Sequence, residues 1–202
     1  MSALAFGPLD ARAVHLCIDM QRLFLEPGPW YAGAGLAILP AVRRLLDHAP
    51  DRAIFTRFIT AERADTAKGS WRRYYRHWHA VTRDELGEGA LALHPELAPY
   101  AAGCRVFDKT THDAFDDGAF ARHIETLDPS ALILSGVETD VCVLATALSA
   151  VDLGYRTVIA VDAVTSSVRE SHRACLDHVY PRYDQQIELA SVDEILAAWS
   201  PS

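Results

Sequence analysis

The sequence predicts an α/β protein, a three-layer, doubly wound, mainly parallel sheet of five to six strands with helices on both faces. Short apolar runs rich in β-branched residues alternate with segments whose apolar residues recur at helical spacing, as Leu144, Leu148 and Val151 do. Half of the 202 residues are hydrophobic, which is enough for a full core. We therefore expect one domain over 1–202.

Six segments have the character of buried strands. They are short, apolar and bounded by polar or turn-forming residues, as strands covered on both faces are. The segments are 13–19, 52–58, 104–109, 131–136, 157–162 and, with a less regular pattern, 186–190.

The segments between these strands predict crossover helices. Apolar residues at helical spacing occur over 35–49, 116–127, 142–155, 167–180 and 191–199. Gly154 is suited to stop the third of these helices in a left-handed conformation, and Ser191 is suited to cap the start of the last.

An excursion at about 59–99 interrupts the alternation. It is basic and aromatic, too polar for a core strand and too long for an ordinary connection, so we expect it to act as a lid or a subunit contact. Arginines interleaved with Trp71, Tyr74, Tyr75 and Trp78 would suit single-stranded nucleic acid. The acidic remainder of the chain argues against that partner.

The net charge of −8 disfavours nucleic acid and anionic membrane surfaces, and favours a small-molecule substrate. No stretch approaches the roughly 20 apolar residues of a membrane span, and the N-terminus lacks a basic flank followed by an apolar segment, so we expect a cytoplasmic protein. Four cysteines without CxxC spacing argue against a disulfide framework or a structural zinc site.

Three polar residues stand where the carboxyl ends of strands should meet. Asp19 ends the first strand, Lys109 ends the third, and Cys142 opens the helix after the fourth. Singly, such residues usually cap a turn, carry a solvated charge or pack as a small hydrophobe. Together they are what a thiol nucleophile needs, because Asp19 can take the thiol proton and Lys109 can stabilise the thiolate. We expect these three to be catalytic.

The sequence resembles the isochorismatase-like superfamily of cysteine hydrolases, which includes nicotinamidases, N-carbamoylsarcosine amidases, ureidoacrylate amidases and biuret hydrolases. "CIDMQRLF" matches the family's strand, aspartate, Gln and Phe, here Asp19, Gln21 and Phe24. Lys109 followed six residues later by Phe115 is the second element. "GVETDVCV" matches the Gly-x-x-Thr-x-x-Cys-Val pattern, the most specific of the three.

The resemblance implies a triad of Asp19, Lys109 and Cys142 on a six-stranded parallel sheet. It also implies a non-proline cis peptide between Val137 and Glu138. That bond would turn the backbone N–H of Glu138 toward the point faced by the N–H of Cys142, forming an oxyanion hole. Many relatives hold a small or apolar residue where this chain has Glu138, which leaves the substrate's size open.

The metal site of nicotinamidases is missing from this sequence. Those relatives carry an Asp-x-His and a further histidine after the second strand, where this chain has Phe58, Thr60 and Ala64. His77 and His79 have a His-x-His spacing, but on a helix they diverge and in a loop they are ordinary surface residues. We expect no metal and no cofactor. No catalytic role is expected for the remaining thiols or for other histidines and aspartates near the motifs: Cys17, Cys104, Cys175, His112, Asp113, His172 and His178.

The predicted function is a metal-independent cysteine amidohydrolase that cleaves the C–N bond of a small amide, carbamoyl or ureido compound through a Cys142 thioester. Residues expected to bind the substrate are Gln21, Phe24, Trp30 and Trp78. An isochorismatase-type vinyl-ether hydrolase is one alternative, and a non-catalytic binding module on the same fold is another. As relatives commonly are, the protein is expected to be a homodimer or homotetramer.

Overall fold

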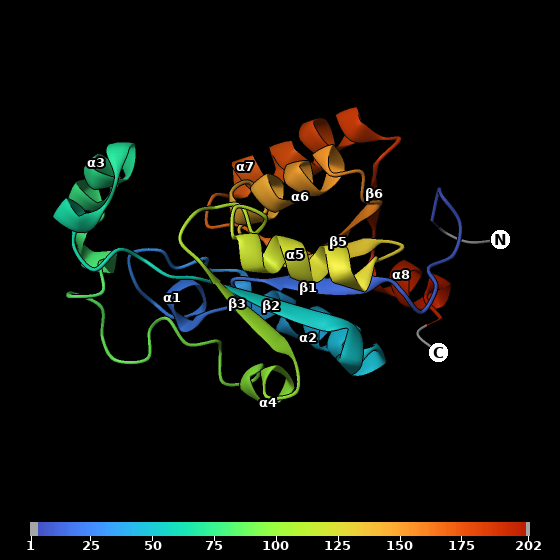
Figure 1. Cartoon of the computed structure of the whole chain (residues 1–202), viewed down its shortest axis with the longest axis horizontal. Helices are drawn as coiled ribbons and strands as arrows, with labels where there is room; N and C mark the ends of the chain where they lie inside the picture. The colour runs from blue at the N-terminus through green and yellow to red at the C-terminus, as the bar shows by residue number, and fades with distance from the viewer. Residues whose placement is uncertain (1–3, 201–202) are drawn as a thin grey trace.

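The computed structural model describes residues 4–200 and contains a six-stranded, all-parallel sheet in the order β3-β2-β1-β4-β5-β6 (Figure 1). This confirms the predicted fold class. The strands are β1 Val14–Ile18, β2 Ala53–Phe58, β3 Arg105–Lys109, β4 Leu132–Val137, β5 Thr157–Thr165 and β6 Ile187–Ala190.

The strand order reverses between β1 and β4. From β1 the chain continues to β2 and β3 on one side, and β4 leads to β5 and β6 on the other. The neighbouring strands β1 and β4 are in register from Val14 opposite Leu132 to Ile18 opposite Gly136. In open α/β sheets, ligands bind in the crevice beyond the carboxyl ends of the strands at such a point.

Helices cover both faces of the sheet. α2 packs on β4 and β5 together with α8, and α6 packs on the same two strands from the opposite face, where α5 and α7 also lie (Figure 1). The helices are α1 Arg22–Leu25, α2 Gly35–His48, α3 Gly69–His77, α4 Ala98–Ala101, α5 Gly118–Leu127, α6 Cys142–Asp152, α7 Arg169–Ala174 and α8 Val192–Ala198. Over residues 4–200, no helix combines the length and the apolar character needed to cross a bilayer.

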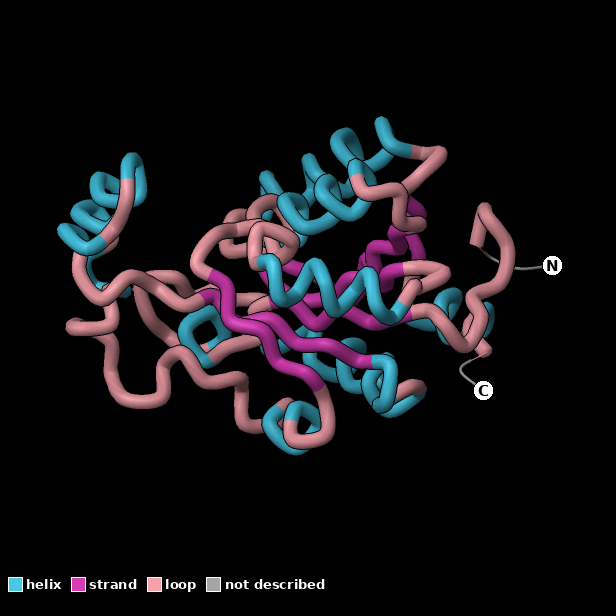
Figure 2. The backbone as a smooth tube through the Cα atoms, in the orientation of Figure 1, coloured by secondary structure: helices cyan, strands magenta, loops and turns pink. Residues whose placement is uncertain are grey.

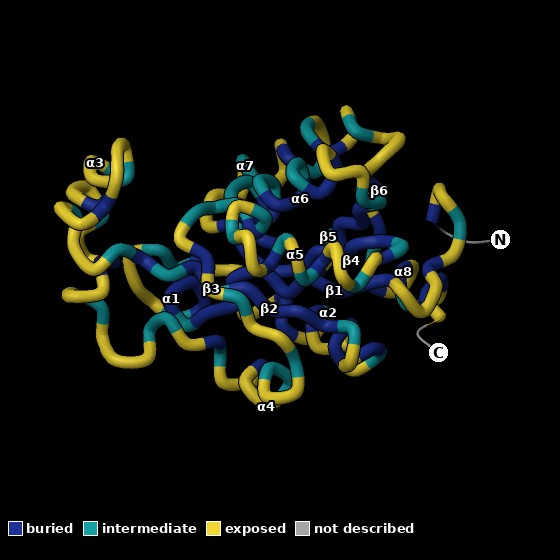
Figure 3. The backbone as a smooth tube through the Cα atoms, viewed as in Figure 1, coloured by how far each residue is buried: buried dark blue, intermediate teal, exposed yellow. Residues whose placement is uncertain are grey.

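The central strands β1 and β4 are buried along their whole length (Figure 3). Two polar side chains lie among them, both fully buried, and they contact each other: His15 Nε2 lies 2.7 Å from the hydroxyl of Ser135. Burial lowers the pKa of His15 to about 3, because the charged imidazolium would lose its hydration. His15 is therefore neutral in the folded protein at neutral pH.

Both predicted helix boundaries are confirmed. Ser191 Oγ accepts the N–H of Glu194, and the Glu194 carboxylate accepts the N–H of Ser191, which is a reciprocal capping box at the start of α8. Gly154 follows α6 with φ +86°, a conformation that glycine adopts without steric cost.

The helix expected over 167–180 is shorter and irregular. α7 covers only Arg169–Ala174, a π-helical turn follows over Cys175–Val179, and a 3-10 turn over Tyr180–Tyr183 contains Pro181. Proline has no N–H to donate and clashes with the preceding turn, which explains why α-helical geometry does not continue through this segment.

The segment 59–99 leaves the sheet and returns, mostly as loop with α3 at its far end (Figure 2). The outgoing and returning arms are joined where the N–H groups of Arg83 and Asp84 donate to the carbonyls of Ala61 and Glu62. Much of α3 is exposed, and Tyr75 is its one buried residue (Figure 3). The excursion is therefore anchored at its base and presents a largely solvent-facing helix.

Candidate active site

Asp19 and Lys109 form a buried ion pair at the carboxyl edge of the sheet. Asp19 follows β1, Lys109 is the last residue of β3, and the Lys109 Nζ lies 2.7 Å from Asp19 Oδ2. Thr56, on the strand between them, donates its hydroxyl to Asp19 Oδ1 at 2.7 Å. The backbone of Asp19 is left-handed, with φ 51°, a conformation in which aspartate is enriched. Both oxygens of the carboxylate are thus held in place.

The Lys109 ammonium is fully engaged by the protein. Besides Asp19, it donates to the carbonyls of Thr111 at 3.1 Å and His112 at 3.0 Å, and it lies 5.0 Å from the centroid of the Phe58 ring. Burial is the largest single influence and would lower the pKa of Lys109, but the interactions with Asp19 and Cys142 together outweigh it and the pKa is raised. Lys109 is therefore a fixed positive charge beneath the site.

Cys142 is the first residue of α6 and is 4% exposed. Burial raises the pKa of its thiol and the charge of Asp19 raises it further, while Lys109 acts in the opposite direction. The net direction is upward, so the thiol is protonated at rest at neutral pH. Asp19 and Lys109 both interact with this thiol, and the three residues predicted as a triad are thus brought together.

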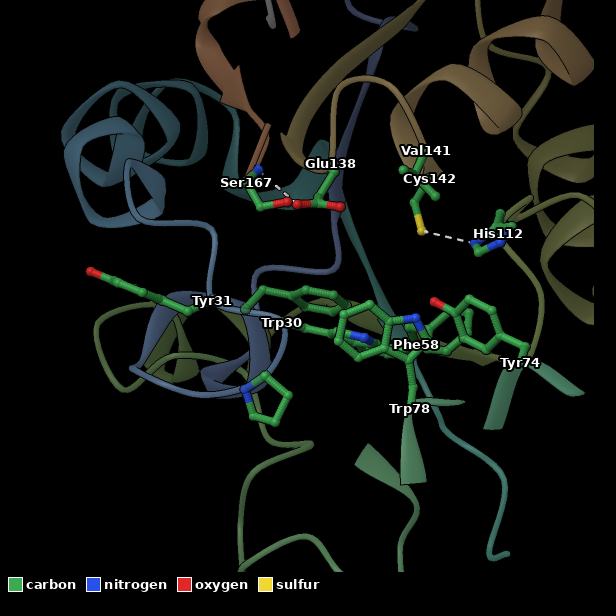
Figure 4. A pocket seen from close by; sticks show the side chains of 12 residues that line it. Trp30, Tyr31, Phe58, Tyr74, Trp78, His112, Glu138, Val141, Cys142 and Ser167 are labelled. Carbon is green, nitrogen blue, oxygen red and sulfur yellow. Dashed lines mark hydrogen bonds between the residues drawn. The ribbon is translucent and has the colours of Figure 1, made fainter. Parts of the chain in front are cut away.

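His112 also lies at the site, although no catalytic role is predicted for it from the sequence. Its Nδ1 is 3.9 Å from Cys142 Sγ, and its ring stacks on Phe58 with centroids 5.9 Å apart (Figure 4). Burial and the neighbouring Lys109 lower the pKa of His112, which keeps the imidazole neutral at pH 7. The available signal was its position three residues after Lys109, in the turn that leaves the strand.

The turn that presents Cys142 contains a cis peptide between Val137 and Glu138, as the family resemblance implied. The Glu138 carbonyl accepts the N–H groups of Val141 and Val143, each at 3.0 Å. The hydroxyl of Tyr180 donates to the Thr139 carbonyl at 2.8 Å. The turn between β4 and α6 is therefore fixed by hydrogen bonds from both sides.

A cavity of about 180 Å³ opens above Cys142. Figure 4 shows a group of aromatic side chains on one side, facing Glu138, Val141, Cys142 and His112 on the other. The aromatic lining residues are Phe24, Trp30, Tyr31, Phe58, Tyr74 and Trp78. Three of these, Phe24, Trp30 and Trp78, were predicted as substrate-binding residues. Tyr74 and Trp78 come from the excursion, which thus forms part of the cavity wall.

Gln21 does not line this cavity, contrary to the prediction that it binds substrate. Its amide nitrogen donates to the carbonyls of Phe58 at 3.0 Å and Leu91 at 2.9 Å, and its oxygen accepts the N–H of Phe58 at 2.7 Å. The side chain is fully buried. Gln21 instead joins the end of β2 and the returning arm of the excursion to the segment after β1.

The remaining cysteines and the two histidines with His-x-His spacing lie outside the triad. Cys17, Cys104 and Cys175 are free thiols whose pKa values are raised by burial. His77 and His79 stand at the end of α3 and in the 3-10 turn after it. Among residues 4–200, no group of three or more His, Cys, Asp and Glu side chains is placed to hold a metal ion.

Known proteins share this fold and part of this sequence. Over 67 residues the chain is 39% identical to the uncharacterized isochorismatase family protein YecD of Escherichia coli O157:H7, a match that covers 33% of this chain and only 34% of that relative. A cysteine hydrolase from Pseudomonas syringae pv. phaseolicola superposes with a TM-score of 0.77 at 21% identity, over 93% of this chain and 92% of that one. The nicotinamidase SaPncA from Staphylococcus aureus gives 0.66 at 20% identity, over 88% and 99%.

At these identities the solved structures establish the fold. The family follows from the sequence as a whole, because residues 13–191 match the family model described as Isochorismatase domain, and this match contains all three triad residues. The solved structures and this chain share the α/β architecture in which the six-stranded parallel sheet brings the triad residues together. The chain therefore belongs to the isochorismatase family.

Proposed function

We propose that the protein is a cysteine amidohydrolase that cleaves the C–N bond of a small amide, carbamoyl or ureido compound. The observation that carries the proposal is the Cys142 thiol at the cavity wall, on whose pKa both members of the buried pair of Asp19 and Lys109 act. A thiol with a base and a fixed cation beside it is the arrangement that nucleophilic catalysis requires.

In the proposed first half-reaction, Cys142 Sγ attacks the substrate carbonyl while Asp19 takes the thiol proton. Because the resting thiol has a raised pKa, the proton has to leave as the C–S bond forms. Lys109 stabilises the sulfur as negative charge develops on it. The backbone N–H groups of Glu138 and Cys142 serve as the oxyanion hole. The tetrahedral intermediate then collapses, Asp19 returns the proton to the leaving nitrogen, and the amine departs from a thioester.

In the second half-reaction, water attacks the thioester carbonyl and Asp19 takes one of its protons. Collapse of this intermediate breaks the C–S bond, releases the acid product and restores the protonated thiol from Asp19. The atoms balance: the oxygen of the water joins the acyl group, one of its protons passes through Asp19 to the Cys142 sulfur, the other stays on the acid product, and the amine has left with the original thiol proton. No redox partner is needed.

Three further features of the proposal remain predictions. The enzyme acts without a metal, it resides in the cytoplasm, and it assembles as a homodimer or homotetramer. The excursion supports the last of these, because α3 presents a largely exposed surface at one end of the molecule (Figure 1).

The proposal is tested by ammonia release from a panel of small amides, carbamoyl compounds and ureides, and by pyruvate release from isochorismate as the vinyl-ether substrate. We expect release from at least one C–N compound and none from the Cys142→Ala protein. Hydrolysis that persists in Cys142→Ala, or turnover of isochorismate alone, would contradict a thioester mechanism.

A further inference from the structure

The cavity carries a carboxylate beside the nucleophile. Glu138 lies in the wall next to Cys142, and its Oε1 accepts the backbone N–H of Ser167 at 2.7 Å (Figure 4). Within residues 4–200 this is the one hydrogen bond of that side chain, so Oε2 is available to a ligand. The contact with Ser167 fixes the carboxylate's orientation without consuming its accepting capacity.

The opposite wall is built from aromatic rings. Trp30 is its centre, with the ring centroids of Phe24, Phe58, Tyr74 and Trp78 between 5.8 and 6.3 Å from its own. Several of these rings meet edge to face, so the wall presents both faces and edges to the cavity. The face of an aromatic ring carries negative electrostatic potential and attracts cations.

Positive side chains are missing from the same surface. In the described part of the chain, neither Lys nor Arg lines the cavity. Lys109 lies beneath it, 1% exposed, with Asp19 and two carbonyls taking its donors. His112 is neutral at pH 7, since burial and Lys109 lower its pKa. Glu138 therefore brings the one formal charge at the cavity wall, and that charge is negative.

We propose that this cavity selects amides that carry a cationic group, with Glu138 as the residue that determines specificity. The ammonium or quaternary ammonium group would lie between the Glu138 carboxylate and the aromatic wall around Trp30, leaving the carbonyl carbon at Cys142. The inference rests on the proposed function for the bond that is cleaved. It further predicts that amides bearing a carboxylate are poor substrates, because Glu138 repels them and no lysine or arginine receives them.

The test uses three amides that differ chiefly in charge: betaine amide, its uncharged carbon isostere 3,3-dimethylbutanamide, and succinamate. For the wild-type protein we expect kcat/KM for betaine amide to exceed that for the isostere by tenfold or more, with succinamate the poorest. In Glu138→Gln, which keeps the shape and removes the charge, the ratio should fall toward one. Glu170→Gln removes an exposed carboxylate of α7, three residues after Ser167, and should leave the ratio unchanged.

Binding provides a readout that does not depend on hydrolysis. Choline and its uncharged isostere 3,3-dimethylbutan-1-ol contain no amide bond, and quenching of Trp30 and Trp78 fluorescence reports on occupancy of the cavity that they line. We expect tighter binding of choline, by tenfold or more, that is lost in Glu138→Gln.

The two outcomes separate the inference from the proposed function. Preferential, Glu138-dependent choline binding in a protein that cleaves neither these amides nor any compound of the wider panel of amides, carbamoyl compounds and ureides would retain the cation site and overturn the amidohydrolase. Cleavage of all three amides at equal kcat/KM, with choline bound no better than its isostere, would retain the amidohydrolase and overturn the cation site.

Discussion

Lys109 Nζ lies 2.7 Å from Asp19 Oδ2, and neither side chain is more than 1% exposed. A charge pair so far from water is not screened by salt as a surface pair is. Removing either partner alone would destabilise the protein, because the other charge would stay buried without compensation. Substitution of either residue is therefore expected to lower both the turnover rate and the free energy of unfolding.

Lys109→Ala should lower turnover roughly a hundredfold or more, the effect typical of one preorganised electrostatic group. It should also reduce the free energy of unfolding by about 3 to 5 kcal/mol, because Asp19 is left unpaired. Steady-state rates are measured at a temperature where circular dichroism shows the variant folded. Lys68→Ala, at an exposed position, is the control and should change neither quantity. Near-normal turnover of a folded Lys109→Ala protein would remove the lysine from the mechanism.

Alkylation of Cys142 by iodoacetamide should rise with pH, with a midpoint above that of an ordinary thiol. Burial and Asp19 raise the pKa of Cys142 and Lys109 opposes them, so Lys109→Ala should move the midpoint further up and Asp19→Asn should move it down. Mass spectrometry of the labelled peptides gives the alkylation rates. Cys104 is the internal reference, because neither substitution should shift the midpoint of its labelling. A midpoint below the ordinary range would show that the resting group is a thiolate.

Gly136→Ala should destabilise the protein by more than about 3 kcal/mol, which is large for a single substitution. Gly136 has φ +113°, and a Cβ there would collide with the backbone of Ile18 on the neighbouring strand. Gly154→Ala is the matched control, because Gly154 also has a positive φ but a Cβ there would meet no atom within 4 Å. We expect that variant to cost about 1 kcal/mol from the backbone conformation alone. Urea unfolding compares the two, and equal losses would contradict the steric argument.

The stability of the protein should fall as the pH drops below 6.5, in part through His15. Burial lowers its pKa to about 3 in the folded state, so between pH 6.5 and 3 the unfolded chain binds a proton that the folded chain does not. The contribution of His15 to stability is thus complete above pH 6.5 and is lost by about 1.4 kcal/mol for each pH unit below it. His15→Gln should reduce this slope in urea titrations between pH 7 and 5, whereas His79→Gln, at an exposed position, should not.

Dialysis against a chelator should leave activity intact. Phe58 stands where the resemblance to nicotinamidases would place a metal ligand, and its ring instead packs under the Lys109 ammonium. Turnover before and after dialysis is the measurement. Activity that is lost and then restored by zinc or iron would overturn the metal-independent mechanism.

Local patterns were sufficient to predict the sheet and the triad. The strands fall within three residues of their predicted bounds at each end, because β-branched apolar runs in a parallel sheet are buried on both faces and leave a continuous signal. Asp19, Lys109 and Cys142 could be placed together because the carboxyl ends of parallel strands share one edge. The proximity of these three residues thus follows from where each stands relative to the end of a strand.

Side-chain partners distant in the sequence could not be predicted. Gln21 is predicted to bind substrate from its position near Asp19 in the sequence. Its amide instead hydrogen-bonds the carbonyls of Phe58 and Leu91, which are 37 and 70 positions away. His112 enters the cavity because its ring stacks on Phe58, a contact that no periodicity encodes. The helix predicted over 167–180 is too long, because its apolar pattern continues through the π-helical turn that precedes Pro181.

The two walls of the cavity belong to different stretches of chain. Cys142 and Glu138 come from the segment that joins β4 to α6. Tyr74 and Trp78 come from α3 and the residue after it, which lie outside the hydrogen-bonded sheet. Substitutions in the excursion can therefore reshape this part of the cavity wall while Cys142, Asp19 and Lys109 stay untouched. Exchanging this segment between relatives would alter one part of the cavity wall without rebuilding the sheet edge that carries those three residues.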